Sequence, residues 1–524
     1  MSDYNLSHKS LYSLFAILSI ICFIQNSLNR GNKMLKIENK KFFLLFLFII
    51  FIYIFLLSNK KDFHLDESLS FILSTYNSYG YNQHFDENVL YPSKYIQSMM
   101  YGYRDTLSST FNDIYSLYLD NRDRPHTNFY YSLLRLSLIN SSNNLHSLII
   151  RASLLNIAIS VLSFVIFYCI SKKLFKTDCA IFTAIILAFL SPAALSSVLF
   201  FRPYHLQSLF FIIGIYIFYS LIELINNKES ISSKEIIKKS TVYALLISLI
   251  FLTGYFSIFY IFPFFVALIY LAYIKNKNII PLILYITVLT IAFLLVLYPK
   301  YFYGFFSDRA SEALTLTTVN NLFHNLVQSF TRFGKIILLF LCGTIGFIFI
   351  IIYMIYNRKS LASFFWITLF VSSLFFSLYS IILAPYKTLR YIMPVFPVYA
   401  LIIAQSLDFK SKYQWGAFTV IIISLFINLF ITHPEHYLTK IKNVPDNGII
   451  ITSNKTPWKT ASLAPYLDGE YSFKSSCPPQ NWYTSQAAGS IFFIDNQCLT
   501  DIPNDDIDIN SFNDFYKLGI RKPS

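Results

Sequence analysis

The chain has 524 residues, of which 55% are hydrophobic, 19% aromatic and only 13% charged. Soluble domains carry about 25% charged residues, so this composition excludes an ordinary soluble protein and indicates a polytopic membrane protein. The formal net charge of +14 does not indicate a nucleic acid partner, because the cations lie mostly in short loops between apolar runs.

Residues 1–33 form an N-terminal extension that fits the rest poorly. Its apolar stretch, residues 11–24, is short for a membrane span. If this stretch crossed the membrane, the basic residues that follow would lie outside, against the positive-inside rule. We expect either a helix on the membrane surface or a start codon assigned too early, with Met34 as the true start. A signal peptide is less favoured, because no basic leader precedes the stretch and no small-residue cleavage site follows it.

Apolar length predicts about 11 transmembrane helices within a domain of residues 34–432. The expected spans are 42–58, 147–171, 178–198, 205–225, 241–253, 256–273, 281–298, 335–356, 361–383, 391–407 and 416–432. Six successive loops on one side carry the basic residues, which places the N-terminus in the cytoplasm. The odd number of spans then places the C-terminus in the periplasm.

The first large outer loop, residues 59–146, begins with the neighbouring carboxylates Asp66 and Glu67. Carboxylates are costly in hydrocarbon, so a pair at its edge is either the solvated start of a loop or a site. The same loop carries Asp123, Arg124 and His126, and Arg151 lies just inside the next span. A charge at that position needs a partner, for which either carboxylate or a lipid phosphate would serve.

Further polar and aromatic residues mark the outer ends of later spans. They are Arg202, Tyr204, Tyr255, Lys387, Arg390 and Tyr391. The predicted topology brings them to the membrane face of Asp66 and Glu67. Taken singly, Arg202 and Arg390 are better explained as interface anchors, and the tyrosines can be explained as ordinary members of an aromatic belt.

The segment 433–524 is predicted to form a small periplasmic domain, α/β or rich in β-strands. Its alternating apolar runs, 448–451 and 491–494, read as strands. Cys477 and Cys498 are the two cysteines of this segment, and they are expected to form a disulfide unless they are unrelated buried thiols. A metal site at His433 and His436 is disfavoured, because the intervening Pro434 opposes the helix that would align the two rings.

These residues have a common chemical logic. A carboxylate can deprotonate a hydroxyl nucleophile, and arginine or lysine at headgroup level can bind a lipid phosphate. If the donor is a sugar on a polyprenyl phosphate, cleavage turns a phosphodiester into a more highly charged monoester. Cations aimed at that phosphate therefore bind the transition state more tightly than the ground state. The sequence leaves the need for a divalent metal open, because the cationic residues could stabilise the phosphate without one and Asp66 and Glu67 could also hold one.

The ordered motifs resemble the GT-C glycosyltransferases, and most closely family 39 and its relatives, which include protein O-mannosyltransferases and lipid A aminoarabinose transferases. The likeness covers roughly residues 40–410 in order. It rests on the acid pair after the first span and on Arg124-Pro125-His126 followed by Tyr130-Tyr131-Ser132-Leu133-Leu134-Arg135-Leu136. It continues in Leu190-Ser191-Pro192, Arg202-Pro203-Tyr204 and Arg390-Tyr391-Ile392-Met393-Pro394.

The resemblance implies an inverting transferase that uses a polyprenyl-phosphate sugar. Asp66 matches the acid expected to act as the base, Glu67 matches its neighbour, and Arg202 and Arg390 match positions near the donor phosphate. Two departures leave the donor and the acceptor open. His126 stands where many members have a second proline, and the turn at Gly254 lacks the usual Lys or His.

The function favoured by the sequence is transfer of a sugar at the periplasmic face of a bacterial inner membrane to lipopolysaccharide, another glycan or a protein. A lipid or glycan transporter or flippase would predict charged or broken-helix sites near the bilayer midplane, whereas the ionisable residues crowd one interface. An O-antigen polymerase or ligase would carry its arginines in a long late loop. A structural envelope protein leaves the ordered Arg and Tyr motifs without a role.

Overall fold

The structure is a computed structural model that describes the following residues: 40–60, 64–76, 86, 89–95, 106–121, 126–139, 145–226, 233–306, 363–383, 389–408, 414–431, 445–453, 457–463, 466–467, 469–474, 476–502, 506–512 and 516–522, with isolated positions between 327 and 355. The N-terminal extension and most of the predicted span 335–356 lie outside these residues.

The chain divides into two compact units. The helical unit comprises residues 1–58, 118–130 and 153–435, and the mixed unit comprises residues 59–117, 131–152 and 436–524. The mixed unit thus includes most of the first large loop together with the C-terminal segment.

Six helices among the described residues are long and apolar enough to cross a membrane. They are α2 (Lys40–Ser58), α7 (Leu145–Leu174), α10 (Tyr204–Asn226), α12 (Ser257–Lys275), α13 (Ile280–Leu297) with the short turn before it, and α19 (Phe364–Leu383). A bent pair, α8 (Asp178–Leu190) and α9 (Pro192–Leu199), makes a seventh if it counts as one span. The expected polytopic helical fold is therefore confirmed.

Three further predicted spans coincide with helices that are not both long enough and apolar enough to count as membrane-spanning. These helices are α11 (Ser233–Phe251), α20 (Phe396–Gln405) and α21 (Gln414–Ile431). The first turns of α11 carry several lysines, and α20 is shorter than a bilayer is thick. Of the 11 predicted spans, some are confirmed by helices that are long and apolar enough to cross a membrane. The three spans at α11, α20 and α21 are matched by helices only in their position along the chain.

The break between α8 and α9 follows from two adjacent residues. Ser191 adopts an extended conformation (φ −65°, ψ 153°), and its side-chain oxygen accepts a hydrogen bond from the Ala194 amide at 3.3 Å. Pro192 occupies the first turn of α9, where its missing N–H has no helical partner to lose. The chain therefore bends by 45° here and delivers the next loop, residues 200–203, to the start of α10.

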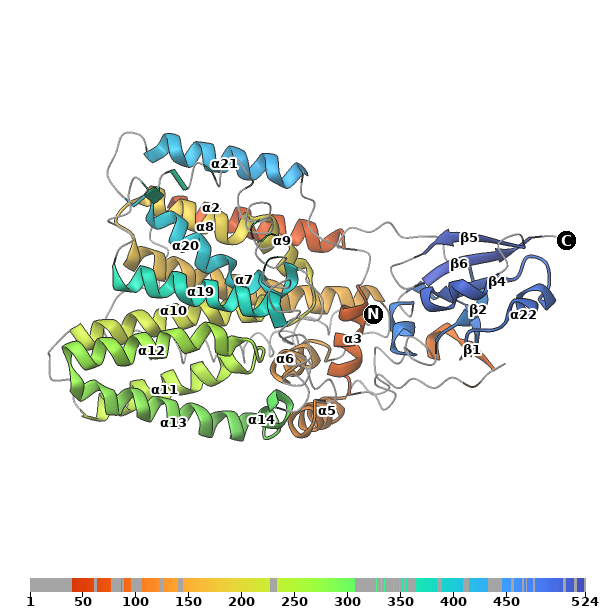
Figure 1. The fold of residues 1–524 in the computed structure, drawn as a ribbon, viewed down its shortest axis with the longest axis horizontal. Coiled ribbons are helices and arrows are strands. Elements are labelled where there is room, and N and C mark those ends of the chain that lie inside the picture. Colours follow the sequence, from red (N-terminus) through yellow and green to blue (C-terminus); the bar gives the residue numbers. More distant parts are fainter. Residues whose placement is uncertain are drawn as a thin grey trace, which may run out of the picture. The chain divides into compact units, whose positions relative to one another are not determined.

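Helix α10 packs against several helices of the helical unit. This helix is buried over most of its length and contacts α11, α12 and α20. Stacked rings join it to α12, with the centroids of Phe211 and Tyr260 4.0 Å apart. Figure 1 shows α10, α12, α19 and α20 running roughly side by side. A rigid α10 gives a fixed base to the residues that precede its first turn.

Five strands of the C-terminal segment and one strand of the first loop, β1, form a six-stranded mixed sheet with strand order β1-β3-β2-β4-β6-β5 (Figure 1). The strands are β1 (Leu90–Pro92), β2 (Asn447–Ile451), β3 (Glu470–Lys474), β4 (Ile491–Asp495), β5 (Ile507–Ser511) and β6 (Tyr516–Arg521). The central strands β3, β2 and β4 are parallel, and the other pairs are antiparallel. The strands expected at 448–451 and 491–494 are present as β2 and β4.

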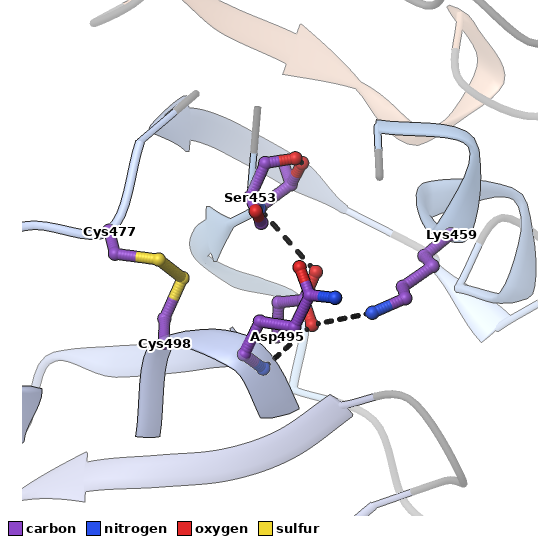
Figure 2. The surroundings of a disulfide bond; sticks show 7 residues. Ser453, Lys459, Cys477, Asp495 and Cys498 are labelled. Carbon is purple, nitrogen blue, oxygen red and sulfur yellow. Dashed lines mark hydrogen bonds and ion pairs between the residues drawn. A yellow bond between two sulfur atoms is a disulfide. The ribbon is translucent and has the colours of Figure 1, made fainter. Parts of the chain in front are cut away.

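One face of this sheet carries a compact apolar core that includes Ile451, Phe492 and Ile494. The 3₁₀-helix η9 (Asn496–Asp501) and the helix α22 (Gln480–Ser485) cover it. Cys498 in η9 forms a disulfide with Cys477, with their Cα atoms 5.1 Å apart (Figure 2). This is the pairing expected from the two cysteines of the segment.

Candidate functional site

The acid pair begins a short helix, α3 (Leu65–Ser74), in the mixed unit. Every residue of this helix is buried except Asp66. The Asp66 side chain keeps 20% of its surface exposed, whereas the Glu67 side chain is fully buried. Two adjacent carboxylates therefore have different environments, and only that of Asp66 is open to a substrate.

His64 and Glu67 cap the first turn of α3. The Asp66 amide donates to His64 Nδ1 at 3.1 Å, and the His64 amide donates to the Glu67 Oε2 atom at 2.8 Å. Reciprocal bonds of this kind satisfy amides that have no partner within the helix. Both carboxylates also lie in the first turn, where the helix dipole favours negative charge. The position of Asp66 is thus fixed by the backbone on which it sits.

A buried ion pair joins Glu67 to Lys60. The Lys60 ammonium lies 3.0 Å from one Glu67 oxygen and 3.1 Å from the other, and both side chains are fully buried. Since the Glu67 carboxylate is held by Lys60 and by the His64 amide, the two acids do not offer a matched pair of ligands to a cation. Among the described residues, no group of three or more His, Cys, Asp or Glu is arranged to hold a metal.

Lys60 was not among the predicted site residues. The sequence contains a signal for it. Lys60 and Lys61 directly follow the first predicted span on its predicted periplasmic side, where the positive-inside rule predicts few cations. A lysine that breaks this rule beside an acid pair indicates a local ion pair.

In the helical unit, Arg202 lies in the loop between α9 and α10 and is 4% exposed. Its amide donates to the Phe200 carbonyl at 2.7 Å, which folds the loop tightly. Its Nη2 atom lies 2.9 Å from His126 Nε2. A guanidinium can only donate, so His126 accepts through Nε2, which requires an imidazole with that nitrogen unprotonated.

The segment that carries His126 is anchored by hydrogen bonds to the backbone. The Asn121 side-chain amide donates to the carbonyl oxygens of His126 and Thr127, each at 2.9 Å. The Thr127 hydroxyl donates to the Leu252 carbonyl at 2.5 Å. These bonds attach the segment to the turn between α11 and α12, so His126 has a rigid support.

A second part of this cluster comes from the 3₁₀-helix η5 (Leu389–Tyr391). The Tyr391 ring meets the Tyr204 ring edge to face, with the centroids 6.1 Å apart. The Arg390 guanidinium carbon lies 5.3 Å from the centroid of the Tyr391 ring. A cation over an aromatic face is stabilised while its N–H groups remain available at the edges. We call His126, Arg202, Tyr204, Arg390 and Tyr391 the basic–aromatic cluster.

Tyr255 lies in a separate aromatic group. It is 3% exposed, and its ring packs 5.1 Å from that of Tyr301. Burial raises the pKa of the Tyr301 hydroxyl above its ordinary value, so this side chain stays neutral. The group covers the C-terminal ends of α11 and α13, which is a packing role for Tyr255.

Of the four remaining predicted site residues, the structure describes only Arg151. Arg151 lies in the second turn of α7 and is partly exposed. Lys387, Asp123 and Arg124 lie outside the described residues. The acid pair belongs to the mixed unit and the basic–aromatic cluster to the helical unit.

No protein-family model and no curated protein sequence matches the chain. Two chains of known structure match it, and one is the crystal structure of ArnT from Cupriavidus metallidurans bound to undecaprenyl phosphate. The match has a TM-score of 0.53 at 10% sequence identity and covers 91% of this chain and 97% of that one. The fold is that of ArnT.

The likeness to ArnT confirms the GT-C fold that the ordered motifs predicted. The unmatched share of the chain is shorter than the segment 433–524. The fold shared with ArnT therefore extends into the C-terminal domain, for which the sequence offered no resemblance.

Proposed function

We propose that the protein is a glycosyltransferase of a bacterial inner membrane that moves a sugar from a polyprenyl phosphate to an envelope acceptor, with inversion at the anomeric carbon. The observation that carries this proposal is the ArnT fold combined with an α3 on which Asp66 alone is open. The solved ArnT structure holds undecaprenyl phosphate, which supports a lipid of this class as the carrier. The periplasmic face is inferred from the distribution of basic residues.

Asp66 is assigned as the general base. In the proposed reaction its carboxylate takes the proton of an acceptor hydroxyl while that oxygen forms a bond to the anomeric carbon. The bond from the anomeric carbon to the phosphate oxygen breaks, and the polyprenyl phosphate leaves. A base fixed by a capped and buried helix loses little entropy in reaching its geometry.

Glu67 has a different assignment in this proposal. Its carboxylate is bonded to Lys60 and to the His64 amide, so we assign it to the support of α3 and not to proton transfer. The pair Asp66 and Glu67 then consists of one reacting acid and one structural acid.

The basic–aromatic cluster is assigned to the donor phosphate. Negative charge grows on the phosphate as the glycosidic bond breaks, and a positioned guanidinium stabilises that charge. Arg202 is held by His126 and Arg390 by Tyr391, so both cations are pre-oriented. Lys387 is expected to add a third cation. Asp123, Arg124, Arg151 and Tyr255 are proposed to support the acceptor or the surrounding loops.

The test is mass spectrometry of envelope glycans from a deletion strain with and without the wild-type gene. A sugar that is lost on deletion and restored by the gene supports the transferase, and the mass difference gives the sugar type and the acceptor. An envelope that is unchanged on deletion contradicts the proposal and favours the transporter or the structural role.

A further inference from the structure

The C-terminal domain contacts α3 through the 3₁₀-helix η7 (Pro457–Ser462). Both elements belong to the mixed unit. Thr460 and Ser462 of η7 are buried, as is Leu463 directly after it. Since every residue of α3 except Asp66 is also buried, η7 is one of the surfaces that fix the orientation of this helix.

A second buried ion pair holds η7 to the sheet. The Lys459 ammonium lies 3.0 Å from Asp495 Oδ1, and the two side chains are 10% and 0% exposed. Asp495 is the last residue of β4, and its carboxylate also accepts the amides of Gln497 at 3.0 Å and Ser453 at 3.4 Å. Figure 2 shows Lys459 reaching Asp495 from the side opposite the disulfide. The pair therefore links η7 to the ends of β2 and β4.

A third contact supports the same attachment. The Thr460 hydroxyl lies 3.4 Å from the Tyr516 hydroxyl of β6. Burial raises the pKa of Tyr516 above its ordinary value, so the phenol stays protonated and able to donate. Adjacent residues of η7 are thus tied to two strands of the sheet.

The chain beyond α3 is attached to the same sheet. Strand β1 pairs with β3, with Tyr91 opposite Tyr471. The Ser93 amide then donates to the Gly469 carbonyl at 2.6 Å. The C-terminal domain consequently holds the first loop at two places, at α3 and at β1.

A buried ion pair adds little net stability, because the cost of desolvating the two charges offsets much of their attraction. Its geometry is nevertheless demanding. Removing one partner leaves an uncompensated buried charge, and moving the partners apart weakens their attraction. Lys459 and Asp495 therefore give η7 a defined position more than they add to the free energy of unfolding.

We infer that Lys459 and Asp495 are positioning residues for the reaction. They hold η7 against α3 and thereby keep Asp66 in its reactive placement, which gives the C-terminal domain a role in catalysis without any contact to substrate. The claim that this placement matters for catalysis rests on the proposed function. The claim that the Lys459–Asp495 pair holds α3 in position through η7, which we call the mechanical part, does not.

The experiment compares Lys459→Met, Asp495→Asn and Lys459→Arg in the full-length protein in lipid nanodiscs. Lys522→Met is the matched control, because Lys522 pairs with Asp508 in the same domain but the two side chains are 39% and 65% exposed. Hydrogen exchange of residues 65–74 reports on α3, and glycan transfer in cells reports on activity.

We expect Lys459→Met and Asp495→Asn to raise exchange in α3 by about tenfold, because a buried charge loses its partner. Transfer should fall by about tenfold or more at equal membrane abundance, since a displaced base reacts slowly. In purified enzyme the loss should lie in kcat, with KM for the lipid donor unchanged. Lys459→Arg should restore most of both signals, and Lys522→Met should match the wild type.

Two results would overturn the inference. One is unchanged exchange of α3 in Lys459→Met, which would show that η7 does not depend on the pair. The other is a loosened α3 with full transfer, which would show that the placement of α3 does not matter to the reaction. If the wild type itself transfers no sugar, the exchange data still decide the mechanical part, while the proposed function alone fails.

Discussion

The acidic helix α3 and the basic–aromatic cluster hold their charges in opposite ways. In α3 the backbone is fixed by caps, a buried ion pair and packing, and the partly exposed Asp66 carboxylate is the exception. In the cluster the cations are held by side chains, with Arg202 bonded to His126 and Arg390 lying over Tyr391. Both arrangements fix a charged group before any reaction begins, which is what the proposed base and the proposed phosphate-binding cations require.

The largest effect is expected from the exposed acid. Asp66→Asn should reduce transfer by about 10²- to 10⁴-fold, because an amide cannot accept the proton. The temperature of unfolding should fall by no more than a few degrees, since Asn keeps the shape of the side chain and removes only the favourable charge in the first turn of α3. Glycan recovery per amount of inserted protein measures the first quantity, and thermal unfolding in detergent measures the second.

In the cluster, Arg202→Ala should reduce transfer by about 10²-fold, comparable to the loss of one transition-state hydrogen-bond donor. Arg202→Lys should recover only part of this, because an ammonium lacks the planar fork of the guanidinium. The control is Lys300→Ala, which removes an exposed cation that pairs with Asp120 at 2.8 Å in the same unit. Equal losses in the control and in Arg202→Ala would contradict a specific role for Arg202.

Within α3, Lys60→Met should mainly affect stability. It leaves Glu67 buried without its partner, which costs about 3–5 kcal/mol. Adding Glu67→Gln should recover much of this loss, because the amide oxygen can still accept the His64 N–H bond while no charge remains. Denaturant or thermal unfolding of the purified variants measures both. If Lys60→Met and the double variant unfold alike, the ion pair does not hold α3.

The smallest effect is expected at His126. His126→Phe keeps a ring but removes the acceptor of the Arg202 bond. We expect KM for the lipid donor to rise by about tenfold, near the lower end of the effect of losing a hydrogen bond to a charged group. His126→Gln retains an acceptor and should behave nearly as the wild type. Steady-state kinetics with the purified enzyme separate the two, and an unchanged KM in His126→Phe would remove His126 from the support of Arg202.

Much of the fold was predictable from the sequence because membrane spans and buried strands are local signals. The span 42–58 and the strand 491–494 each follow from the length and periodicity of an apolar run. The break at Ser191 and Pro192 was not predicted, because it lies inside the expected span 178–198, although a capping hydroxyl and a missing amide are local signals for it. The association of β1 with the C-terminal sheet was not predictable, because Leu90–Pro92 is too short to carry a period and its partner lies far along the chain.

The candidate site was predictable in its residue types but not in its division of roles. Asp66 and Glu67 are adjacent and chemically alike, so only the tertiary burial of α3 distinguishes them. His126 was expected on the basis of a motif in which it replaces a proline, and its bond to Arg202 depends on the folding of two loops far apart in sequence. The part played by η7 is likewise a product of packing, because nothing near Lys459 in the sequence refers to α3.

The most direct test of the account is a side-by-side measurement of Asp66→Asn and Glu67→Gln, with glycan transfer and unfolding temperature recorded for each. The account predicts that Asp66→Asn abolishes transfer in a protein of normal stability. It predicts that Glu67→Gln lowers stability and retains transfer in the fraction that folds. Full transfer by Asp66→Asn, or loss of transfer by Glu67→Gln at normal stability, would contradict the assignment of the base to Asp66 alone.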